Sequence, residues 1–266
     1  MPGRLPTIAD FPPSVTLSIT LPPASQPATN ILLLLHGLGD TNESFKTLGQ
    51  QMALPETACI SIRGPKPLPF DLGGFHWSDD LLFDQSGGEM DGDAGFTAAA
   101  KLIAEDVIKK VLVEKCGYAH REIIVFGFGQ GAMAALSAAR EFPEHRNLTR
   151  AYRADRIAVS INSATSSTHL GGVISIGGRL PKEAPASLNP KCRTPVLTCC
   201  GSSNSIVTAS AEEKLKNVFE FVEIKRYRRP GDSMPRSRDE MMPIMQFFAR
   251  GLKSTQGVPE GAVEVG

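Results

Sequence analysis

The chain has no excess of charge and no long apolar segment. Lysine and arginine together number 28, as do aspartate and glutamate, so the formal net charge is +0. This balance gives no argument for nucleic acid as a partner, and we expect none. The longest aliphatic run, Ile31–Leu35, is far too short to cross a bilayer, so no integral membrane segment is expected. Residues 1–14 also lack the apolar core of a secretory signal peptide.

Signals for disulfides and metal ions are missing too. The five cysteines are an odd number, and Cys199 and Cys200 are neighbours in an expected strand, where their side chains point to opposite faces. A chain with reduced thiols in the cytoplasm is the favoured interpretation. No C-x-x-C or H-E-x-x-H spacing occurs, so neither a metal ion nor another cofactor is expected.

The hydrophobic pattern alternates between strands and helices. An apolar stripe from Phe96 to Val111 predicts a helix capped by Asp93. The glycine, proline and aspartate content of residues 66–92 indicates a long surface loop. Strands alternating with helices predict an α/β fold with a mostly parallel central sheet and helices on both faces. Apolar runs predict strands at 15–21, 31–35, 58–62, 172–176, 195–200 and 222–227, and before a glycine-rich turn at 127; two later helices are expected at about 209–220 and 238–252.

The domain organisation expected from this pattern is simple. A chain of 266 residues suits one large α/β domain, which we place at residues 1–253. Residues 141–170 are largely polar and irregular, and they indicate an insertion. Residues 254–266 are mostly small and polar, and they predict a disordered tail.

A glycine occupies the position where this pattern would place a catalytic serine. From Glu122 onward, a buried strand, a glycine-rich turn and an alanine-rich helix follow one another. This context fits the nucleophile elbow, G-x-S-x-G, of α/β-hydrolases. Here the turn reads Gly127-Phe-Gly129-Gln-Gly131, and no G-x-S-x-G occurs elsewhere in the chain. Glycine has no side chain that could attack a carbonyl.

Four segments together resemble one branch of these hydrolases, the acyl-protein thioesterase and carboxylesterase family. The similarity runs from about residue 12 to about residue 252, except for the 141–170 insertion. It implies an α/β-hydrolase fold and, in active members, a serine hydrolase. The segments are Leu33-Leu-Leu-His-Gly-Leu-Gly-Asp40, Gly127-Phe-Gly-Gln-Gly131, Thr194-Pro-Val-Leu197, and Glu240-Met-Met242 with Gln246-Phe247.

The resemblance implies that all three catalytic positions are substituted. The family's serine falls on Gly129, its aspartate on Asn204 and its histidine on Met234. The last histidine of the chain is His169, so none follows it to serve as the general base. Asn204 has no charge to stabilise an imidazolium, and Met234 cannot accept a proton. Without the triad, only the smaller contribution of oxyanion hole and binding would remain.

The oxyanion hole is expected to survive, because its donors are backbone groups. By resemblance these are the N–H groups of Leu38 and Gln130, which could still hold a carbonyl or carboxylate oxygen. The equally weighted alternative is that the glycines at 37, 39 and 131 remain only because the turns need them. Trp77 resembles an aromatic residue near the family's acyl site, or else covers the core.

Other interpretations of single motifs remain open. The spacing Gly127-x-Gly129-x-x-Ala132 also fits a dinucleotide fingerprint, but residues 145–156 show neither the second strand nor its acidic residue. Cys199 or Cys200 could replace the nucleophile, with His36 or His169 approaching in space, although two core thiols are favoured.

Two charged segments invite functional interpretations as well. His76 lies close to Asp79 and Asp80, which suggests catalysis, but a solvated loop face is favoured. A basic stretch could contact an acidic partner or a lipid headgroup, although a solvated strand edge and loop is preferred. It comprises Lys225, Arg226, Arg228, Arg229, Arg236 and Arg238.

We therefore expect a non-hydrolytic binding or regulatory protein that keeps the hydrolase fold and a pocket for an acyl chain or fatty acid. A protein partner fits a regulatory role. The alternative is an active ester or thioester hydrolase that uses non-standard catalytic residues.

Overall fold

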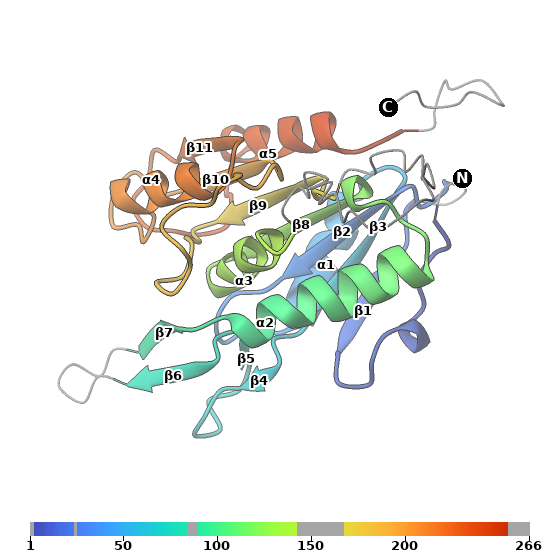
Figure 1. Ribbon diagram of the computed structural model, residues 1–266, viewed down its shortest axis with the longest axis horizontal. Coiled ribbons are helices and arrows are strands. Elements are labelled where there is room, and N and C mark those ends of the chain that lie inside the picture. The colour runs from blue at the N-terminus through green and yellow to red at the C-terminus, as the bar shows by residue number, and fades with distance from the viewer. Residues whose placement is uncertain (1–2, 24–25, 84–89, 143–167, 255–266) are drawn as a thin grey trace, which may run out of the picture.

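A seven-stranded sheet organises the part of the chain that the computed structural model describes, which is residues 3–23, 26–83, 90–142 and 168–254 (Figure 1). The strand order is β1-β3-β2-β8-β9-β10-β11. Only β1 runs antiparallel to its neighbour, so the expected mostly parallel sheet is confirmed. The strands are β1 (Leu17–Thr20), β2 (Asn30–Leu35), β3 (Thr57–Ile62), β8 (Ile123–Phe128), β9 (Gly172–Ile176), β10 (Val196–Cys200) and β11 (Val222–Arg226).

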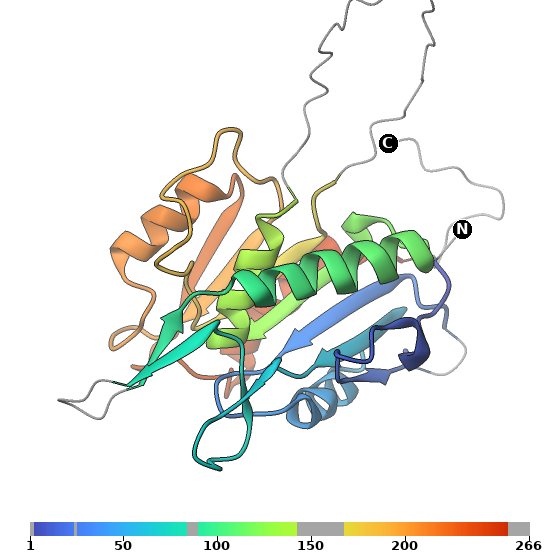
Figure 2. The ribbon, with the colours of Figure 1, turned by 60° about the horizontal axis from the view of Figure 1, so that its bottom comes forward.

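Helices cover both faces of this sheet, as Figures 1 and 2 show. On one face lie α2 (Thr97–Lys101), its π-helical continuation η2 (Leu102–Lys115), α3 (Gln130–Ala139) and α4 (Ala209–Val218). On the other lie α1 (Asn42–Met52) and α5 (Arg238–Gly251). Two short 3-10 turns, η1 (Ile8–Asp10) and η3 (His120–Glu122), precede β1 and β8.

The central strand β2 shows why the sheet needs two helical layers. All six of its residues are buried. Ile31, Leu33 and Leu35 pack in the core cluster that includes η2 and α3, whereas Leu32 and Leu34 pack with α1 and α5. A strand buried on both faces is expected to be apolar at every position, and the run of leucines provides this.

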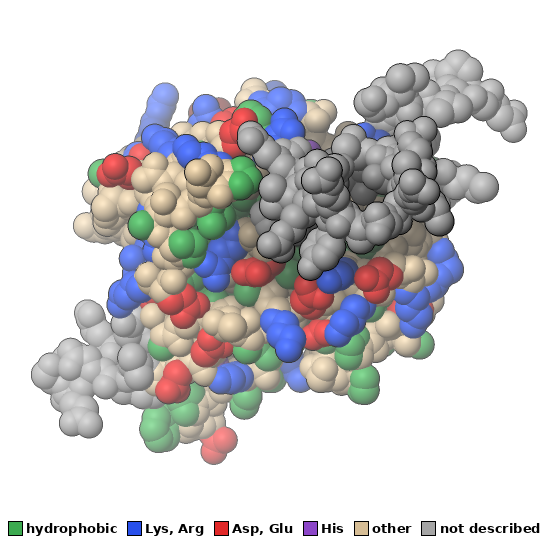
Figure 3. All heavy atoms as spheres, viewed as in Figure 1, with side chains coloured by type: hydrophobic (Ala, Val, Ile, Leu, Met, Phe, Trp, Pro, Cys, Tyr) green, Lys and Arg blue, Asp and Glu red, His purple; other side chains and the backbone are tan. Residues whose placement is uncertain are grey.

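The outer helical surface carries charges of both signs. Figure 3 shows basic and acidic side chains interspersed over η2. Two ion pairs on this helix join residues one turn apart. The ammonium nitrogen lies 3.1 Å from the carboxylate in Lys109–Glu105 and 2.7 Å in Lys110–Asp106. Such exposed pairs add little stability, and they leave no single-sign field on this face.

Residues 66–92 were predicted to form a long surface loop, and this is wrong. The segment contributes β4 (Lys66–Pro67), β5 (Phe75–His76), β6 (Asp80–Phe83) and the start of β7 (Met90–Ala94), which pair as two small antiparallel sheets. A strand of two residues is too short to show alternation of polar and apolar side chains. The surrounding glycines and prolines are typical of a loop and so favoured the wrong prediction.

Helix α1 was not predicted at all. Thr41 caps its first turn by accepting a hydrogen bond from the N–H of Glu43 at 3.3 Å. Its buried residues are Asn42, Phe45 and Gly49. Only one of these is a large hydrophobe, so the helix has no clear apolar stripe in the sequence.

The expected cap of the next helix is also wrong. Helix α2 begins at Thr97, four residues after Asp93. Its first N–H groups, those of Thr97 and Ala98, donate instead to the carboxylate of Asp79 at 2.8 and 3.0 Å. Asp93 lies in β7 and pairs with Arg179 at 2.8 Å. A cap supplied from a distant segment leaves no local sequence signal.

Most of the insertion expected at 141–170, and the tail expected at 254–266 apart from Ser254, lie outside the described residues. The division of the chain into one domain, an insertion and a tail therefore stays a prediction.

Candidate functional site

The glycine-rich turns that follow β2 and β8 lie side by side at one edge of the sheet. The two strands are parallel neighbours, with Leu35 opposite Gly127 at their carboxyl ends. Ligands of open α/β sheets bind at this edge. The fold therefore brings the turn at residues 36–41 against the start of α3, and this pair of turns is the candidate site.

Gly129 has the backbone expected at an elbow. Its φ of 52° and ψ of −117° lie in a region that L side chains rarely adopt. Its N–H donates to the carbonyl of Ile176 at 2.9 Å, and its own carbonyl accepts from Ala132 and Met133 at 3.1 Å each. A Cβ at this position would have no described atom within 4 Å. Glycine relieves backbone strain here, but space does not require it.

The flanking glycines serve a different purpose. A Cβ at Gly131 would lie 2.3 Å from the carbonyl oxygen of His36 and 2.4 Å from that of Leu35. A Cβ at Gly127 would lie 2.5 Å from the backbone nitrogen of Ala132. These two glycines allow strand and helix backbones to touch, so packing alone explains them. This supports the interpretation that these two glycines are retained for folding.

The imidazole of His36 is committed to structure. Its Nδ1 lies 2.7 Å from the carbonyl oxygen of Gly37, and its Nε2 accepts a hydrogen bond from the N–H of Gly64 at 2.8 Å. This pattern fits a neutral ring that donates from Nδ1. Burial lowers the pKa of the ring, which also favours the neutral form. His36 therefore has no free nitrogen with which to act as a base for a cysteine.

Trp77 supports the turn from inside the core. It is fully buried, and its indole N–H donates to the carbonyl of His36 at 2.8 Å. Its backbone N–H donates to the side-chain oxygen of Gln130 at 3.0 Å, while the amide nitrogen of Gln130 donates to the carbonyl of Gly92 at 2.7 Å. This geometry favours the core interpretation of Trp77, because the side chain has no exposed surface to offer a ligand.

The two predicted oxyanion donors remain available. Within the described part of the chain, the backbone N–H groups of Leu38 and Gln130 donate to no acceptor. Gln130 is the first residue of α3, whose N-terminal end favours negative charge. The side chain of Leu38 is 40% exposed, so this turn reaches the surface. The role of these two N–H groups as an oxyanion hole stays a prediction.

Asn204 and Met234 lie on two loops that are held together without them. Asp232 accepts hydrogen bonds from the N–H groups of Gly201 and Ile206, at 3.0 and 2.9 Å, and so joins the loop after β10 to the loop after β11. Asn204 itself has a φ of 49°. No local sequence signal predicts this role of Asp232, because its partners lie 26 and 31 residues away.

A second set of contacts fixes the loop that carries Met234. The guanidinium of Arg229 pairs with both carboxylate oxygens of Glu240, at 2.9 and 3.1 Å, and donates to the carbonyl of Met234 at 2.9 Å. The Met234 side chain packs against the apolar cluster beneath. This loop keeps its shape through an ion pair and apolar contact, with no imidazole involved.

Of the other candidate histidines, His169 lies away from the elbow, whereas His76 lies behind it. His169 precedes β9, whose opposite end reaches Gly129 through Ile176. The expectation that His76 lies on a solvated loop face is wrong, because its side chain is buried. Its Nδ1 lies 3.1 Å from the hydroxyl of Ser78, a pair that the sequence analysis missed. Ser78 also accepts from the amide of Gln130 at 3.2 Å, which places the pair beneath the elbow.

The adjacent cysteines are core residues. Cys199 and Cys200 are both fully buried, and no described cysteine forms a disulfide. Burial raises the pKa of Cys199 to about 12 and also raises the pKa of Cys200. Both thiols therefore stay protonated near neutral pH and are poor nucleophiles.

The basic stretch lies on the edge strand β11 and the loop behind it. Arg226 donates to the carbonyls of Gly201 and Val207 at 3.1 and 3.0 Å, and Arg229 forms the ion pair with Glu240. The remaining four cationic side chains are exposed. This supports the preferred interpretation, a solvated edge and loop, because these four side chains are exposed and the other two are bound within the chain.

The described residues bear only in part on the dinucleotide alternative and on the expectations about metal ions and membrane segments. The dinucleotide alternative depended on residues 145–156, which lie outside them. Among residues 3–23, 26–83, 90–142 and 168–254, no cluster of three or more His, Cys, Asp or Glu side chains is arranged to hold a metal ion. Over the same ranges, no helix combines the length and apolar character needed to cross a membrane.

A mostly parallel sheet with a strand, a sharp glycine-rich turn and a helix at its centre is the architecture of the α/β-hydrolases. The chain belongs to the phospholipase/carboxylesterase family, whose sequence model matches residues 19–151.

Individual relatives agree with this assignment. An uncharacterized hydrolase of Schizosaccharomyces pombe is 29% identical over 228 residues, which is 84% of this chain and 83% of the relative. Acyl-protein thioesterase 1 of Saccharomyces cerevisiae is 26% identical over 247 residues, covering 86% and 96%. Among solved structures, esterase PE8 aligns with a TM-score of 0.64 at 21% identity over 90% of this chain and 99% of its own. Acyl-protein thioesterase 2 of Zea mays aligns at 0.58 and 21% over the same shares.

We predict that Gly129→Ser and Gly129→Ala each lower the free energy of unfolding by about 1–3 kcal/mol, because each places a Cβ on a backbone that L residues rarely adopt. Gly131→Ala should cost more, since its Cβ meets two carbonyl oxygens. Urea denaturation of the four proteins measures this. Gly129 variants as stable as the parent would show that the elbow is unstrained and would question its placement.

Proposed function

We propose that this member of the phospholipase/carboxylesterase family is a non-hydrolytic protein that binds an acyl chain or fatty acid at the elbow. The observation that carries the proposal is Gly129, which has the strained backbone of an elbow and no nucleophile. It accompanies the backbone N–H groups of Leu38 and Gln130, which donate to no acceptor among the residues that the structure describes. In this proposal the fold keeps the backbone groups that bind an acyl oxygen and lacks the side chains that would break an ester bond.

The missing chemistry concerns all three roles. A weak nucleophile needs an adjacent base, and a histidine base needs an acid to orient it. The equivalent positions are Gly129, Met234 and Asn204, and none of these side chains can ionise. The histidine that precedes the oxyanion turn, His36, is tied up by two hydrogen bonds. A hydrolytic mechanism would therefore have to start from other residues.

Exposed apolar side chains beside the turn support an acyl ligand. Phe70 and Leu72 are 81% and 61% exposed, on the loop between β4 and β5. Figure 3 shows hydrophobic atoms at the lower edge of the molecule, where this loop ends. The loop's base joins the oxyanion turn through hydrogen bonds of 3.0 Å, from Gly39 to the carbonyl of Phe75 and from Phe75 to that of Asp40. A carboxylate at the donors would thus leave its chain near an apolar surface.

The second candidate function is an active hydrolase with non-standard residues, and one observation favours it. The His76–Ser78 pair places a hydroxyl next to an imidazole at 3.1 Å, close to the elbow. Both side chains are nevertheless buried, with 5% and 1% exposure. A substrate carbonyl could reach this serine only if β5 moved, so we rank this function below binding.

Two wider proposals accompany the binding function. A protein partner would bind the ligand-bound form in preference to the free form. A protein that binds a ligand without converting it needs such a partner if the binding is to have an effect. The cytoplasm is the proposed compartment, which the free thiols of the described cysteines support.

We predict no turnover of short acyl esters or thioesters above a heat-denatured control, because nucleophile, base and acid are all substituted. A fluorophosphonate probe should leave the chain unlabelled, as mass spectrometry of the intact protein would show. Stoichiometric labelling would contradict the proposal. Peptide mapping would then decide between Ser78, which supports the alternative function, and another serine.

Gly129→Ser alone should restore almost no esterase activity, since triad residues act as a unit. Gly129→Ser with Asn204→Asp and Met234→His should exceed the single variant. The matched control is Gly129→Ser with Asn204→Asp, which lacks only the base, and circular dichroism should verify that each variant is folded. Strong esterase activity from the single variant would show that a general base is already in place. It would contradict the proposal that this protein has lost its catalytic residues.

We predict weak binding of fatty acids at the elbow, with amide shifts centred on Leu38 and Gln130 in NMR spectra. Phe70→Ser should weaken the binding of long chains and leave that of acetate unchanged, because it removes apolar surface only. Ile8→Ser is the control, since Ile8 is exposed to 66% and belongs to η1. No response to any chain length at millimolar ligand would mean that the turns are retained for folding alone.

A further inference from the structure

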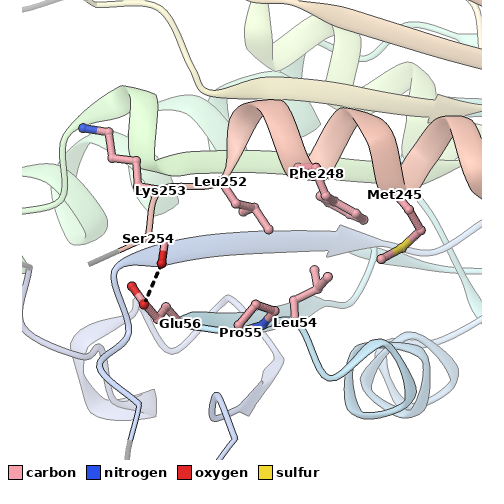
Figure 4. A pocket seen from close by; sticks show the side chains of 9 residues that line it. Leu54, Pro55, Glu56, Met245, Phe248, Leu252, Lys253 and Ser254 are labelled. Carbon is pink, nitrogen blue, oxygen red and sulfur yellow. Dashed lines mark hydrogen bonds between the residues drawn. The ribbon is translucent and has the colours of Figure 1, made fainter. Parts of the chain in front are cut away.

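An apolar cavity and an open strand edge lie outside the elbow. The cavity, of about 290 Å³, lies between α5 and the segment that leads into β3 (Figure 4). Its polar end is already engaged, because the two carboxylate oxygens of Glu56 accept hydrogen bonds from the hydroxyls of Thr29 and Ser254, at 3.1 and 3.0 Å. The cavity therefore selects no ligand head group. The open edge, which belongs to β11, gives a clearer signal, because its sequence is complementary to itself.

β11 is the last strand of the sheet, so one side of its backbone faces no other strand (Figure 1). The carbonyl of Phe221 and the N–H of Tyr227 both bond to β10, at 2.8 and 2.7 Å. Alternate residues of a strand bond to opposite sides, so the odd-numbered residues here bond to β10. The even-numbered residues direct their N–H and carbonyl groups to the open side, where these groups have no partner within the described part of the chain. They are Val222, Ile224 and Arg226.

The sequence of this edge complements a second copy that lies antiparallel to it. Around a two-fold axis at Ile224, each residue before the centre lies opposite the residue equally far after it. Acidic residues then lie opposite basic ones, and an aromatic residue lies opposite another. Opposite charges across a strand pair are stabilising, whereas like charges are destabilising. The facing pairs are Glu220 with Arg228, Phe221 with Tyr227, Val222 with Arg226, and Glu223 with Lys225.

The same axis also satisfies the backbone of the open edge. Ile224 would exchange two hydrogen bonds with Ile224 of the second copy, and Val222 would do so with Arg226. The Glu223–Lys225 pair falls between these bonds, where facing side chains approach each other more closely. A shift of the register by two residues would place Glu223 opposite Glu223 or Lys225 opposite Lys225. Charge therefore selects the symmetric register.

We propose that this chain forms a two-fold symmetric dimer in which β11 pairs antiparallel with β11 of a second copy, so that one sheet runs through both copies. Charged side chains usually keep a strand edge from pairing, but this set repels another copy only when the register is wrong. Phe221, which is 47% exposed at the start of this edge, would be partly covered. A strand pair of this length buries little surface, so we expect a weak, concentration-dependent dimer.

Hydrogen exchange of the full-length parent chain tests the pairing without any substitution. The amide protons of Val222, Ile224 and Arg226 should exchange several-fold more slowly as the protein concentration rises from micromolar to millimolar, because the second copy binds them. Those of Glu223 and Lys225 bond to β10 in either state, so they are the internal control and should not change. Exchange that is independent of concentration, with a sedimentation mass that stays at 28.5 kDa, would overturn the proposal.

Charge reversal tests the register. Lys225→Glu alone and Glu223→Lys alone each place like charges opposite one another, and each should weaken dimerisation roughly tenfold. A mixture of the two variants should dimerise like the parent, because acidic residues of one chain again face basic residues of the other. Lys101→Glu is the control, since it reverses an exposed charge on α2 and should dimerise like the parent.

Sedimentation velocity measures all four proteins and the mixture, and circular dichroism verifies that each variant is folded, as expected for substitutions at exposed positions. Dimers that persist in both single variants would place the interface elsewhere and overturn the proposal. Single variants that stay monomeric when mixed would overturn the antiparallel register. Neither result depends on ligand binding at the elbow, so this proposal and the proposed function fail separately.

Discussion

Direct contact between two backbones is the constraint on which the rest of the site depends. Gly131, at the start of α3, lies against the carbonyl groups of Leu35 and His36 with no room for a Cβ. This contact fixes the distance between the turn after β2 and the turn after β8, and with it the separation of the two free N–H groups. Hydrogen bonds from Trp77 and to His36 then hold the first turn in place.

The sequence was sufficient to predict elements whose signal is local. The leucine run of β2, the glycine-rich turn at 127–131 and the apolar stripe beginning at Phe96 were each readable, and the parallel sheet followed from their alternation. What it could not predict depends on distant partners. The cap that Asp79 gives to α2 and the bridge that Asp232 makes between two loops join segments 18 or more residues apart. Helix α1 was not predicted because two of its three buried residues are asparagine and glycine, so the sequence shows no apolar stripe there.

The candidate site divides in the same way. The positions of Gly129 and Gln130 could be read from spacing, since the elbow motif is contiguous. The role of Trp77 could not, because whether an aromatic ring lines a pocket or fills the core depends on what packs around it. His76 and Ser78 illustrate the same limit: their segment was expected to be solvated, yet both side chains are buried, and Ser78 contacts Gln130.

The burial of Trp77 has a practical consequence for spectroscopy. It is the only tryptophan of the chain, and its indole N–H is bound to the carbonyl that precedes the oxyanion turn. Intrinsic tryptophan emission therefore comes from one known place, one hydrogen bond away from Gln130, the first residue of the helix that follows the elbow. Its wavelength reports the polarity around this buried indole, so a movement that separates the ring from the turn and admits water would appear as a red shift without an introduced label.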